Sequence, residues 1–392
     1  MNDIVILSAT RTPLGSFQGA LASLSAPTLG ATAIRGAVQR AGITPDSVTD
    51  LFMGNVLQAG VGQAPARQAA IQSGLPVGTR CTTVHKVCGS AMESVILGAR
   101  SLALGDSEIV VAGGMESMSS APYLLPKARQ GYRLGNQEVV DSMIHDGLWD
   151  PYQDQHMGNC AEECARTYSF TREQQDAYAM ESFRRANAAQ QAGRFQHEIT
   201  AVEISDRKKG SIIVDQDEGP ARVVYEKIPK LRPAFDAGGT ITAANASTIN
   251  DGAAALVLTT AERAATTGLK PIARIVSYGT HSQEPLWFTT APVTAARNAL
   301  DRAGWTANEV DLWEINEAFA VVPLAFMREL EVPHERVNVR GGAIALGHPI
   351  GASGARILAT LLAEMKERGA QRGLAAICIG GGEGLAVCVE QL

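Results

Sequence analysis

Two stretches of this sequence, APTLGATAIRGAVQRAGITPDSVTDLFMGN (26–55) and APVTAARNALDRAGWTANEVDLWEIN (291–316), follow the same pattern. Each begins with Ala-Pro, continues as an amphipathic helix, reaches Ala-Gly-x-Thr, and then runs through Val and Asp-Leu into an apolar strand. The two copies align Gly42 with Gly304. A second pair of segments, 109–117 and 377–384, aligns Gly113 with Gly380 at a similar separation. The chain therefore contains two related halves.

The strands of these halves are near-continuous apolar runs that alternate with helices, such as IVILSA (4–9) and ARIVSYG (273–279). This pattern is typical of a sheet covered by helices on both faces and predicts an α/β fold. Between the halves, 119–249 is richer in Pro, Tyr, charge and loop signals, and it predicts an inserted domain. One helix is expected there over 171–193, with Thr171 as its N-cap and Gly193 as its stop. RKKG (207–210) is expected to form a surface turn.

These shifts in composition divide the chain. We predict an N-terminal half at 1–118 that is completed by 250–271, an inserted loop domain at 119–249, and a C-terminal half at 272–392.

The whole chain of 392 residues is 45% hydrophobic and 19% charged, as in ordinary globular proteins. Its net charge of −6 and pI of about 5.7 give nucleic-acid binding no support. No apolar run approaches the roughly 20 residues of a membrane helix, so no membrane partner is expected. The six cysteines include no C-x-x-C, and MNDIVILSATRTP lacks a charged-then-apolar leader. These features predict a cytoplasmic protein.

Cys88 lies in TVHKVCGSAMESV (82–94), where small residues and then apolar residues at helical spacing predict a helix that starts at or just after the cysteine. The positive end of a helix favours an anionic sulfur and lowers the thiol pKa toward neutrality. Cys88 is therefore a candidate nucleophile. The alternative is a buried apolar cysteine between small neighbours.

The second half has three unusual places of its own: Asn316 in NEAFA (316–320), His348 in GGAIALGHPIGASGARILATLL (341–362), and Cys378 in AICIGGGEG (376–384). Taken singly, Asn316 could be a helix cap, His348 a hydrogen-bonded loop residue, and Cys378 a core thiol. The glycines at 380–384 lack the G-x-G-x-x-G spacing of a dinucleotide site.

Seven motifs in order resemble the thiolase family, and specifically its biosynthetic branch, which acts on acetyl-CoA. They are IVILSATRTPLGSF, KVCGSAM, QHMG (155–158), NASTINDGAAA (245–255), NEAFA, GHPIGASGAR and CIGGG, and the resemblance covers essentially all 392 residues. It implies a five-layered αβαβα fold built from two similar βαβ halves with an inserted loop domain. The implied activity is reversible Claisen condensation of two acetyl-CoA to acetoacetyl-CoA and CoA through an acetyl-cysteine.

The resemblance also implies roles for single residues. Cys88 is the acyl-accepting nucleophile and His348 the base that activates it. Cys378 is the acid/base that takes the α-proton from the second acyl-CoA. Asn316, through a water, builds one oxyanion hole with His348, and the backbone N–H groups of Cys88 and Gly380 build the other.

Coenzyme A enters only as substrate and product, and neither another cofactor nor a metal is expected. The residues matched to the pantetheine channel are His156, Met157, Ala243, Ser247, Ala318 and Phe319. Arg222, Lys227 and Lys230 are candidates for the CoA phosphates, with a solvated surface as the alternative. Phe288 should fill the space beyond a four-carbon acyl group. The family also suggests a homodimer or a tetramer, with 123–143 as the candidate tetramer contact.

Some positions depart from the family pattern or keep other interpretations open. His85 stands where the family usually has Asn, and like Asn it could donate one hydrogen bond. Ala91 stands where Gly is frequent, and Trp287-Phe288 stands where smaller residues are common. Cys160 and Cys164 could form half a metal site, although core packing is the better interpretation.

Two alternative functions remain. One is a degradative 3-ketoacyl-CoA thiolase with a wider acyl pocket, and the other is a non-catalytic acyl-CoA binding protein. The presence of all four candidate catalytic side chains argues against the second.

Overall fold

The computed structural model describes residues 3–206 and 210–392. Its main feature is a ten-stranded mixed sheet. The order is β4 (Arg80–Val84), β3 (Asp50–Gly54), β5 (Ile109–Ser117), β12 (Asn250–Thr260), β1 (Ile4–Arg11), β13 (Ala273–Ser282), β16 (Glu383–Gln391), β15 (Arg372–Ile379) and β14 (Leu312–Ile315), while β2 (Gly15–Ser16) pairs with β12. The two halves join where β1 pairs with β13 over Ile4–Ile6.

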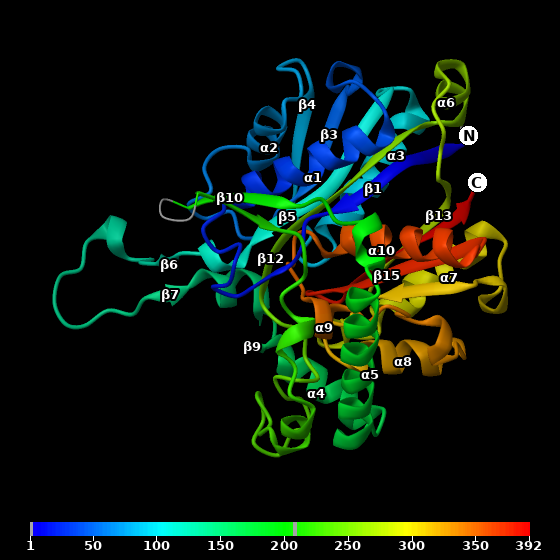
Figure 1. Cartoon of the computed structure of the whole chain (residues 1–392). Coiled ribbons are helices and arrows are strands. Elements are labelled where there is room, and N and C mark those ends of the chain that lie inside the picture. The colour runs from blue at the N-terminus through cyan, green and yellow to red at the C-terminus, as the bar shows by residue number, and fades with distance from the viewer. Residues whose placement is uncertain (1–2, 207–209) are drawn as a thin grey trace.

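Helices cover both faces of each half. On the outer face of the first half lie α1 (Ala26–Ala41) and α2 (Pro65–Ser73), and on the outer face of the second lie α7 (Ala291–Ala303) and α8 (Val321–Leu330). Between the halves lie α3 (Ser90–Leu104) and α10 (Ser353–Arg368), which pack on strands of both. The predicted α/β class and the five layers αβαβα are confirmed (Figure 1).

The predicted repeat extends to single hydrogen bonds. Both β1 and β13 contain a β-bulge immediately before a serine. In the first half, Ser8 Oγ donates to the carbonyl of Ala37 in α1 at 2.7 Å. In the second half, Ser277 Oγ donates to the carbonyl of Ala299 in α7 at 2.6 Å. The same strand–helix junction is therefore built twice.

The segment Val87–Leu104 is long and apolar enough to cross a membrane, with a mean hydropathy of 1.3 over 18 residues. The expectation that no such run exists is therefore wrong. More than half of this segment is buried, because it lies in the middle layer, between the strands of the two halves. A helix between two layers of strands buries apolar side chains on more than one face.

The loop domain contains α4 (Met157–Thr167) and α5 (Arg172–Gln191). As predicted, Thr171 caps α5, in a capping box with Gln174, and Gly193 follows its end. Three short hairpins pair β6 (Tyr123–Leu124) with β7 (Val140–Asp141), β8 (Trp149–Asp150) with β9 (Gln155–His156), and β10 (Val202–Asp206) with β11 (Gly210–Val214). Of the predicted turn at 207–210, residues 207–209 lie outside the described residues.

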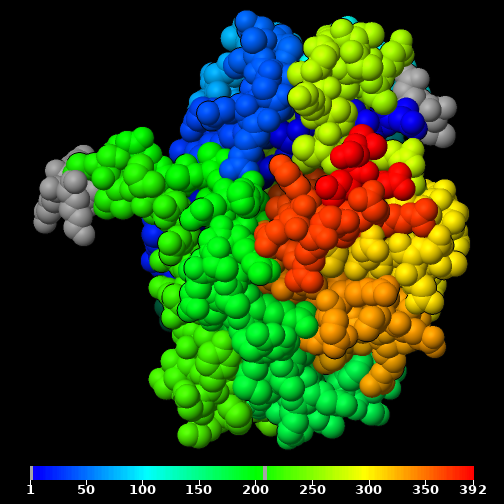
Figure 2. Space-filling view, turned by 45° about the vertical axis from the view of Figure 1, so that its right-hand side comes forward, coloured from blue at the N-terminus to red at the C-terminus, as the bar shows by residue number. Residues whose placement is uncertain are grey.

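The hairpin β6–β7 projects from the body (Figure 1), and Figure 2 shows the loop domain, in green, against the C-terminal half, in orange and red. The other helices are α6 (Ala261–Thr267) and α9 (Ala343–Leu346), a π-helical turn at Ile144–Leu148, and short 3₁₀ helices at Pro45–Ser47, Met118–Ser120, Ala128–Gln130, Arg194–His197, Pro220–Arg222, Tyr225–Lys230, Pro285–Trp287, Ala307–Glu309 and His334–Arg336. The predicted domain boundaries lie next to the end of β5 and the starts of β12 and β13, and they stay predictions.

Candidate active site

Cys88 lies in a tight turn between β4 and α3. Val87 has a φ of +42°, a conformation that β-branched residues rarely adopt and that marks local strain. Ser90 holds the turn, because its hydroxyl accepts from the Lys86 N–H at 2.8 Å and donates to the Val87 carbonyl at 2.6 Å. The predicted helix start directly after Cys88 is confirmed.

The predicted lowering of the Cys88 pKa is wrong. Protein atoms surround the half-buried sulfur closely, and this desolvation raises its pKa to about 11. The backbone N–H groups of Gly380 and Cys88 point at the sulfur and lower the pKa only in part. Burial therefore outweighs the helix terminus, and the resting group is a neutral thiol.

Cys378 is the last but one residue of β15 and is fully buried. Burial first, and then a charge on Cys88, raises its pKa well above the ordinary value. Gly381 and Gly382 follow with φ of +92° and +85°, so the turn after Gly380 needs residues without a side chain. The two thiols, one from each half, therefore lie close enough to influence each other electrostatically.

An ion pair strengthens the contact between these two turns. Lys86 Nζ, two residues before Cys88, pairs with Glu383 at the start of β16. Both side chains are about one-third exposed or less. The pair therefore joins the segment just before Cys88 to the end of the glycine turn that follows Cys378.

His348 lies in the glycine-rich loop between α9 and α10 and is 5% exposed. Its Nε2 lies 3.5 Å from Nδ2 of Asn316, which directly follows β14. The backbone N–H of His348 is held by Asn250 Oδ1 at 3.1 Å. Burial, and then the positive charge of Arg356, lowers the pKa of His348 to about 3. The imidazole is therefore neutral at physiological pH and able to accept a proton.

Glu116 connects the His348 loop to the first half, and sequence reasoning missed it. The loop packs on the nucleophile through Ile350, which shares a hydrophobic cluster with Cys88. Glu116 accepts from the backbone N–H of Gly351 at 2.9 Å and from those of Val56 and Leu57 at 3.0 and 3.1 Å. Burial raises the pKa of this carboxyl to about 7. Its only sequence signal is one acidic residue in the apolar strand IVVAGGMES.

The chain matches the models of the thiolase N-terminal domain over residues 4–262 and of the thiolase C-terminal domain over residues 269–391. The chain belongs to the thiolase family. The predicted family is confirmed over nearly the whole sequence.

Curated thiolase relatives align along the entire chain. The acetyl-CoA acetyltransferases of Pseudomonas aeruginosa and Cupriavidus necator are 52% and 51% identical over 392 residues, which is 100% of both chains in each case. Among solved structures, Acat5 thiolase from Ascaris suum in complex with coenzyme A is 47% identical with a TM-score of 0.94, and the match covers 100% of both chains. The Bacillus anthracis acetyl-CoA acetyltransferase is 40% identical with a TM-score of 0.97, and the match covers 100% of this chain and 99% of that one.

Within this thiolase, the predicted channel residues from distant segments are neighbours. The Ser247 N–H donates to the Ala318 carbonyl at 2.9 Å. Phe319 packs edge-on against Phe288, with ring centroids 6.3 Å apart. Met157 lies beside the thiol site, since a Cβ placed on Gly380 would be 3.6 Å from its methyl carbon.

An aromatic residue that sequence reasoning missed extends this row. Phe235 stacks on His156 with centroids 4.6 Å apart and meets Phe319 edge-on at 6.0 Å. Gly158 makes the stacking possible, because a Cβ there would lie 2.3 Å from the Phe235 ring. The sequence signal is therefore the glycine of QHMG, although this glycine does not indicate that Phe235 is the residue it contacts.

His156 is the N-cap of α4, and its Nδ1 accepts from the Gly158 N–H at 3.0 Å. Burial lowers its pKa, so the ring is neutral. With Nδ1 used as an acceptor, the hydrogen lies on Nε2 and can be donated.

The predicted phosphate ligands lie on the surface of the loop domain. Arg222, Lys227 and Lys230 are exposed on short 3₁₀ helices and pair with no acidic side chain of residues 3–206 and 210–392. Ala243 is also exposed. Their contacts with CoA stay predictions.

The departures from the family pattern are each accommodated. His85 Nδ1 accepts from the Val87 N–H at 3.4 Å, which leaves the hydrogen on Nε2, so the expected donor role of His85 stays a prediction. Ala91 is buried against Gly114. A Cβ added to Gly114 would lie 2.7 Å from the Cβ of Ala91, so this contact has room only for small residues. Cys160 and Cys164 are fully buried in the hydrophobic cluster that contains Phe288, as core packing requires.

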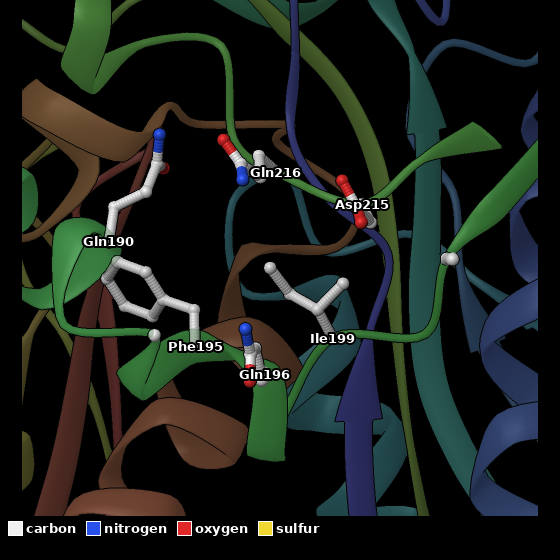
Figure 3. A pocket seen from close by; sticks show the side chains of 8 residues that line it. Gln190, Phe195, Gln196, Ile199, Asp215 and Gln216 are labelled. Atoms are coloured by element: carbon white, nitrogen blue, oxygen red, sulfur yellow. The ribbon is translucent and has the colours of Figure 1, made fainter. Parts of the chain in front are cut away.

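A separate cavity of about 200 Å³ lies where α5 ends. Figure 3 shows its lining, which includes Gln190, Phe195, Ile199 and Asp215. None of the lining residues is a predicted site residue, so this cavity is distinct from the catalytic groups.

Proposed function

We propose that this thiolase catalyses the reversible Claisen condensation of two acetyl-CoA to acetoacetyl-CoA and CoA through an acetyl-Cys88 intermediate. The curated relatives that share about half of its residues over their full length carry the name acetyl-CoA acetyltransferase. One similar solved thiolase was obtained with coenzyme A. The observation that carries the proposal is the meeting of Cys88, the Gly380 N–H and Cys378 at the contact between the two halves.

The first half-reaction transfers an acetyl group to Cys88. As the sulfur attacks the thioester carbonyl, its proton passes to neutral His348, the new C–S bond forms, and the bond to the CoA sulfur breaks. The departing CoA thiolate takes the proton of the neutral Cys378 thiol, which leaves Cys378 as a thiolate, while the proton from Cys88 stays on His348. The N–H groups of Cys88 and Gly380 donate to the transient oxyanion, and one such donor is typically worth about 10²–10³ in rate.

The second half-reaction forms the carbon–carbon bond. The thiolate of Cys378 takes an α-proton from the second acetyl-CoA, and its high pKa makes that thiolate a strong base. The enolate oxygen is stabilised by His348 and by Asn316 through a water. The α-carbon then attacks acetyl-Cys88, the C–S bond breaks, and the released Cys88 thiolate regains its proton from His348, while Cys378 keeps the α-proton and is again a neutral thiol.

The test is CoA-dependent cleavage of acetoacetyl-CoA, together with intact-mass analysis after incubation with acetyl-CoA. We expect turnover and one added acetyl group, located on Cys88 by peptide mapping. A protein that binds acyl-CoA without turnover and without an added acetyl group would instead be a non-catalytic binding protein. Comparing the cleavage of acetoacetyl-CoA with that of a longer 3-ketoacyl-CoA distinguishes the proposed enzyme from a degradative thiolase.

We also propose a homo-oligomer, with the tetramer contact at 123–143. Support comes from apolar side chains on and around the projecting hairpin β6–β7, where Tyr123, Leu134 and Val139 are exposed. Leu134 is 94% exposed, and exposed apolar groups of this kind mark interaction sites. Leu134→Asp should reduce the mass measured by light scattering. An unchanged mass would place the contact elsewhere. A cytoplasmic location without nucleic-acid or membrane partners is likewise proposed from composition and cysteine usage.

A further inference from the structure

The side of the His348 ring that faces away from Asn316 has one polar neighbour of its own. Its Nδ1 lies 2.6 Å from Oγ of Ser353, the first residue of α10. Ser353 is fully buried. The same hydroxyl lies 2.9 Å from the carbonyl oxygen of Pro349, four residues earlier, and donates to it.

The number of hydrogens decides the direction of these bonds. A serine hydroxyl has one hydrogen, and a carbonyl oxygen can only accept. Because Ser353 gives its hydrogen to Pro349, the short contact with His348 requires the hydrogen to come from Nδ1. The other ring nitrogen, Nε2, then has a free lone pair, in agreement with the amide hydrogens of Asn316 on that side.

We propose that Ser353 is a positioning residue that fixes neutral His348 as the Nδ1–H tautomer, so that Nε2 is free to accept the proton of Cys88. The geometry of the bonds carries this inference, while its kinetic consequence rests on the proposed function. The opposite tautomer would leave the Ser353 and Pro349 oxygens in contact without a hydrogen between them. It would also place Nε2–H against the Asn316 amide donor.

The position of Ser353 at the start of α10 makes its contact with His348 rigid. Ser353 occupies the first turn of a long buried helix, and the Ser353 N–H also bonds to Pro349, at 3.0 Å. Both the backbone and the side chain of Ser353 therefore hold the segment that carries His348. The ring has few other orientations available, because it is nearly fully enclosed.

The test measures the tautomer directly by ¹⁵N NMR of histidine-labelled full-length protein, in which protonated and bare ring nitrogens have distinct shifts. His348→Asn assigns the signal by its disappearance. We expect one His348 form in the wild type, with hydrogen on Nδ1 and none on Nε2. A wild-type ring with hydrogen on Nε2 would overturn the inference, whether or not the protein is an active acetyltransferase.

Variants add a kinetic readout. Ser353→Ala should give a mixture of both tautomers and lower kcat by about tenfold or more with little change in KM. Ser353→Thr keeps the hydroxyl and should restore most of both losses. Ser94→Ala is the matched control, because buried Ser94 in α3 also donates to the carbonyl four residues back, at 2.9 Å. A single Nδ1–H form in folded Ser353→Ala, or a kcat within twofold of that of the control, would contradict the proposal.

Discussion

Gly89 and Ile379 touch so closely that a Cβ added to Gly89 would lie 2.4 Å from Cδ1 of Ile379. Gly89 is the residue after Cys88, and Ile379 is the residue after Cys378. The turn that carries one thiol and the strand that carries the other therefore meet where only a hydrogen fits. Since Gly89 has an ordinary φ of −81°, space rather than backbone conformation requires glycine there.

Replacing Gly89 by alanine should separate the two thiols. Ile379 is nearly fully buried and cannot withdraw freely, so we expect a loss of about 1–3 kcal/mol in unfolding free energy. Because the reacting groups move apart, kcat should fall by about 100-fold. Denaturant unfolding and a thiolysis assay measure the two effects. Gly78→Ala is the control, since a Cβ there meets no atom within 4 Å. Equal activity of the two variants would contradict this account.

The two cysteines should differ when replaced by alanine, because they act in different half-reactions. Cys88→Ala should abolish turnover and covalent acetylation. Cys378→Ala should still accept an acetyl group from acetyl-CoA, while condensation falls by about 10²–10⁴. Intact-mass analysis and a condensation assay separate these results. If Cys378→Ala condenses at nearly the wild-type rate, Cys378 is only a core thiol.

The reactivity of Cys88 should depend on alkaline pH. Its pKa is raised to about 11, so the sulfur is a thiol below that pH and becomes a thiolate only as pH rises through it. Alkylation by iodoacetamide should therefore accelerate continuously from pH 7 to 10. A rate that is already constant across pH 7–9 would show a thiolate in the resting enzyme. His348→Asn should leave the pH at which the Cys88 thiolate forms nearly unchanged, because burial rather than an imidazolium sets this pKa.

Glu116→Gln should weaken the junction between the His348 loop and the first half. Each carboxylate oxygen accepts from two donors, including the Gly351 N–H and Asn55 Nδ2, so the amide NH₂ of Gln would face donors in a buried site. We expect a loss of about 2–4 kcal/mol in unfolding free energy. The partly exposed Glu163, paired with Arg166, supplies the control Glu163→Gln, which should change stability by about 0.5 kcal/mol or less. Similar unfolding midpoints for both variants would disprove the role of Glu116.

Short acyl chains should be preferred. Phe288 is buried against Phe319 in the same cluster as Met157. These packed side chains leave the acyl pocket little room to widen for a longer chain. An open pocket would gain roughly 0.8 kcal/mol per buried methylene, and kcat/KM would rise with chain length. We expect acetoacetyl-CoA to be cleaved at least about tenfold more efficiently than 3-ketooctanoyl-CoA, a difference of roughly 1.4 kcal/mol. Equal or better cleavage of the eight-carbon substrate would indicate the degradative branch.

Local patterns were sufficient to predict the elements. The repeated Ala-Pro helix followed by an apolar strand identified the two halves, because periodicity and capping act within a few residues. The same reasoning placed the helix start after Cys88 and the N-cap at Thr171. The motifs around Cys88, Asn316, His348 and Cys378 identified the family, and with it the fold.

By itself, then, the sequence determined the α/β class, the duplicated halves, the family and the candidate catalytic residues. Only the tertiary structure decided the pKa of Cys88, because desolvation depends on every atom packed around the sulfur and not on the adjacent helix alone. It also revealed Glu116, Phe235 and Ser353, whose partners lie on other segments or depend on a side-chain direction. Such contacts form only when the chain has closed around them, and nothing in a linear pattern fixes the distance between two side chains.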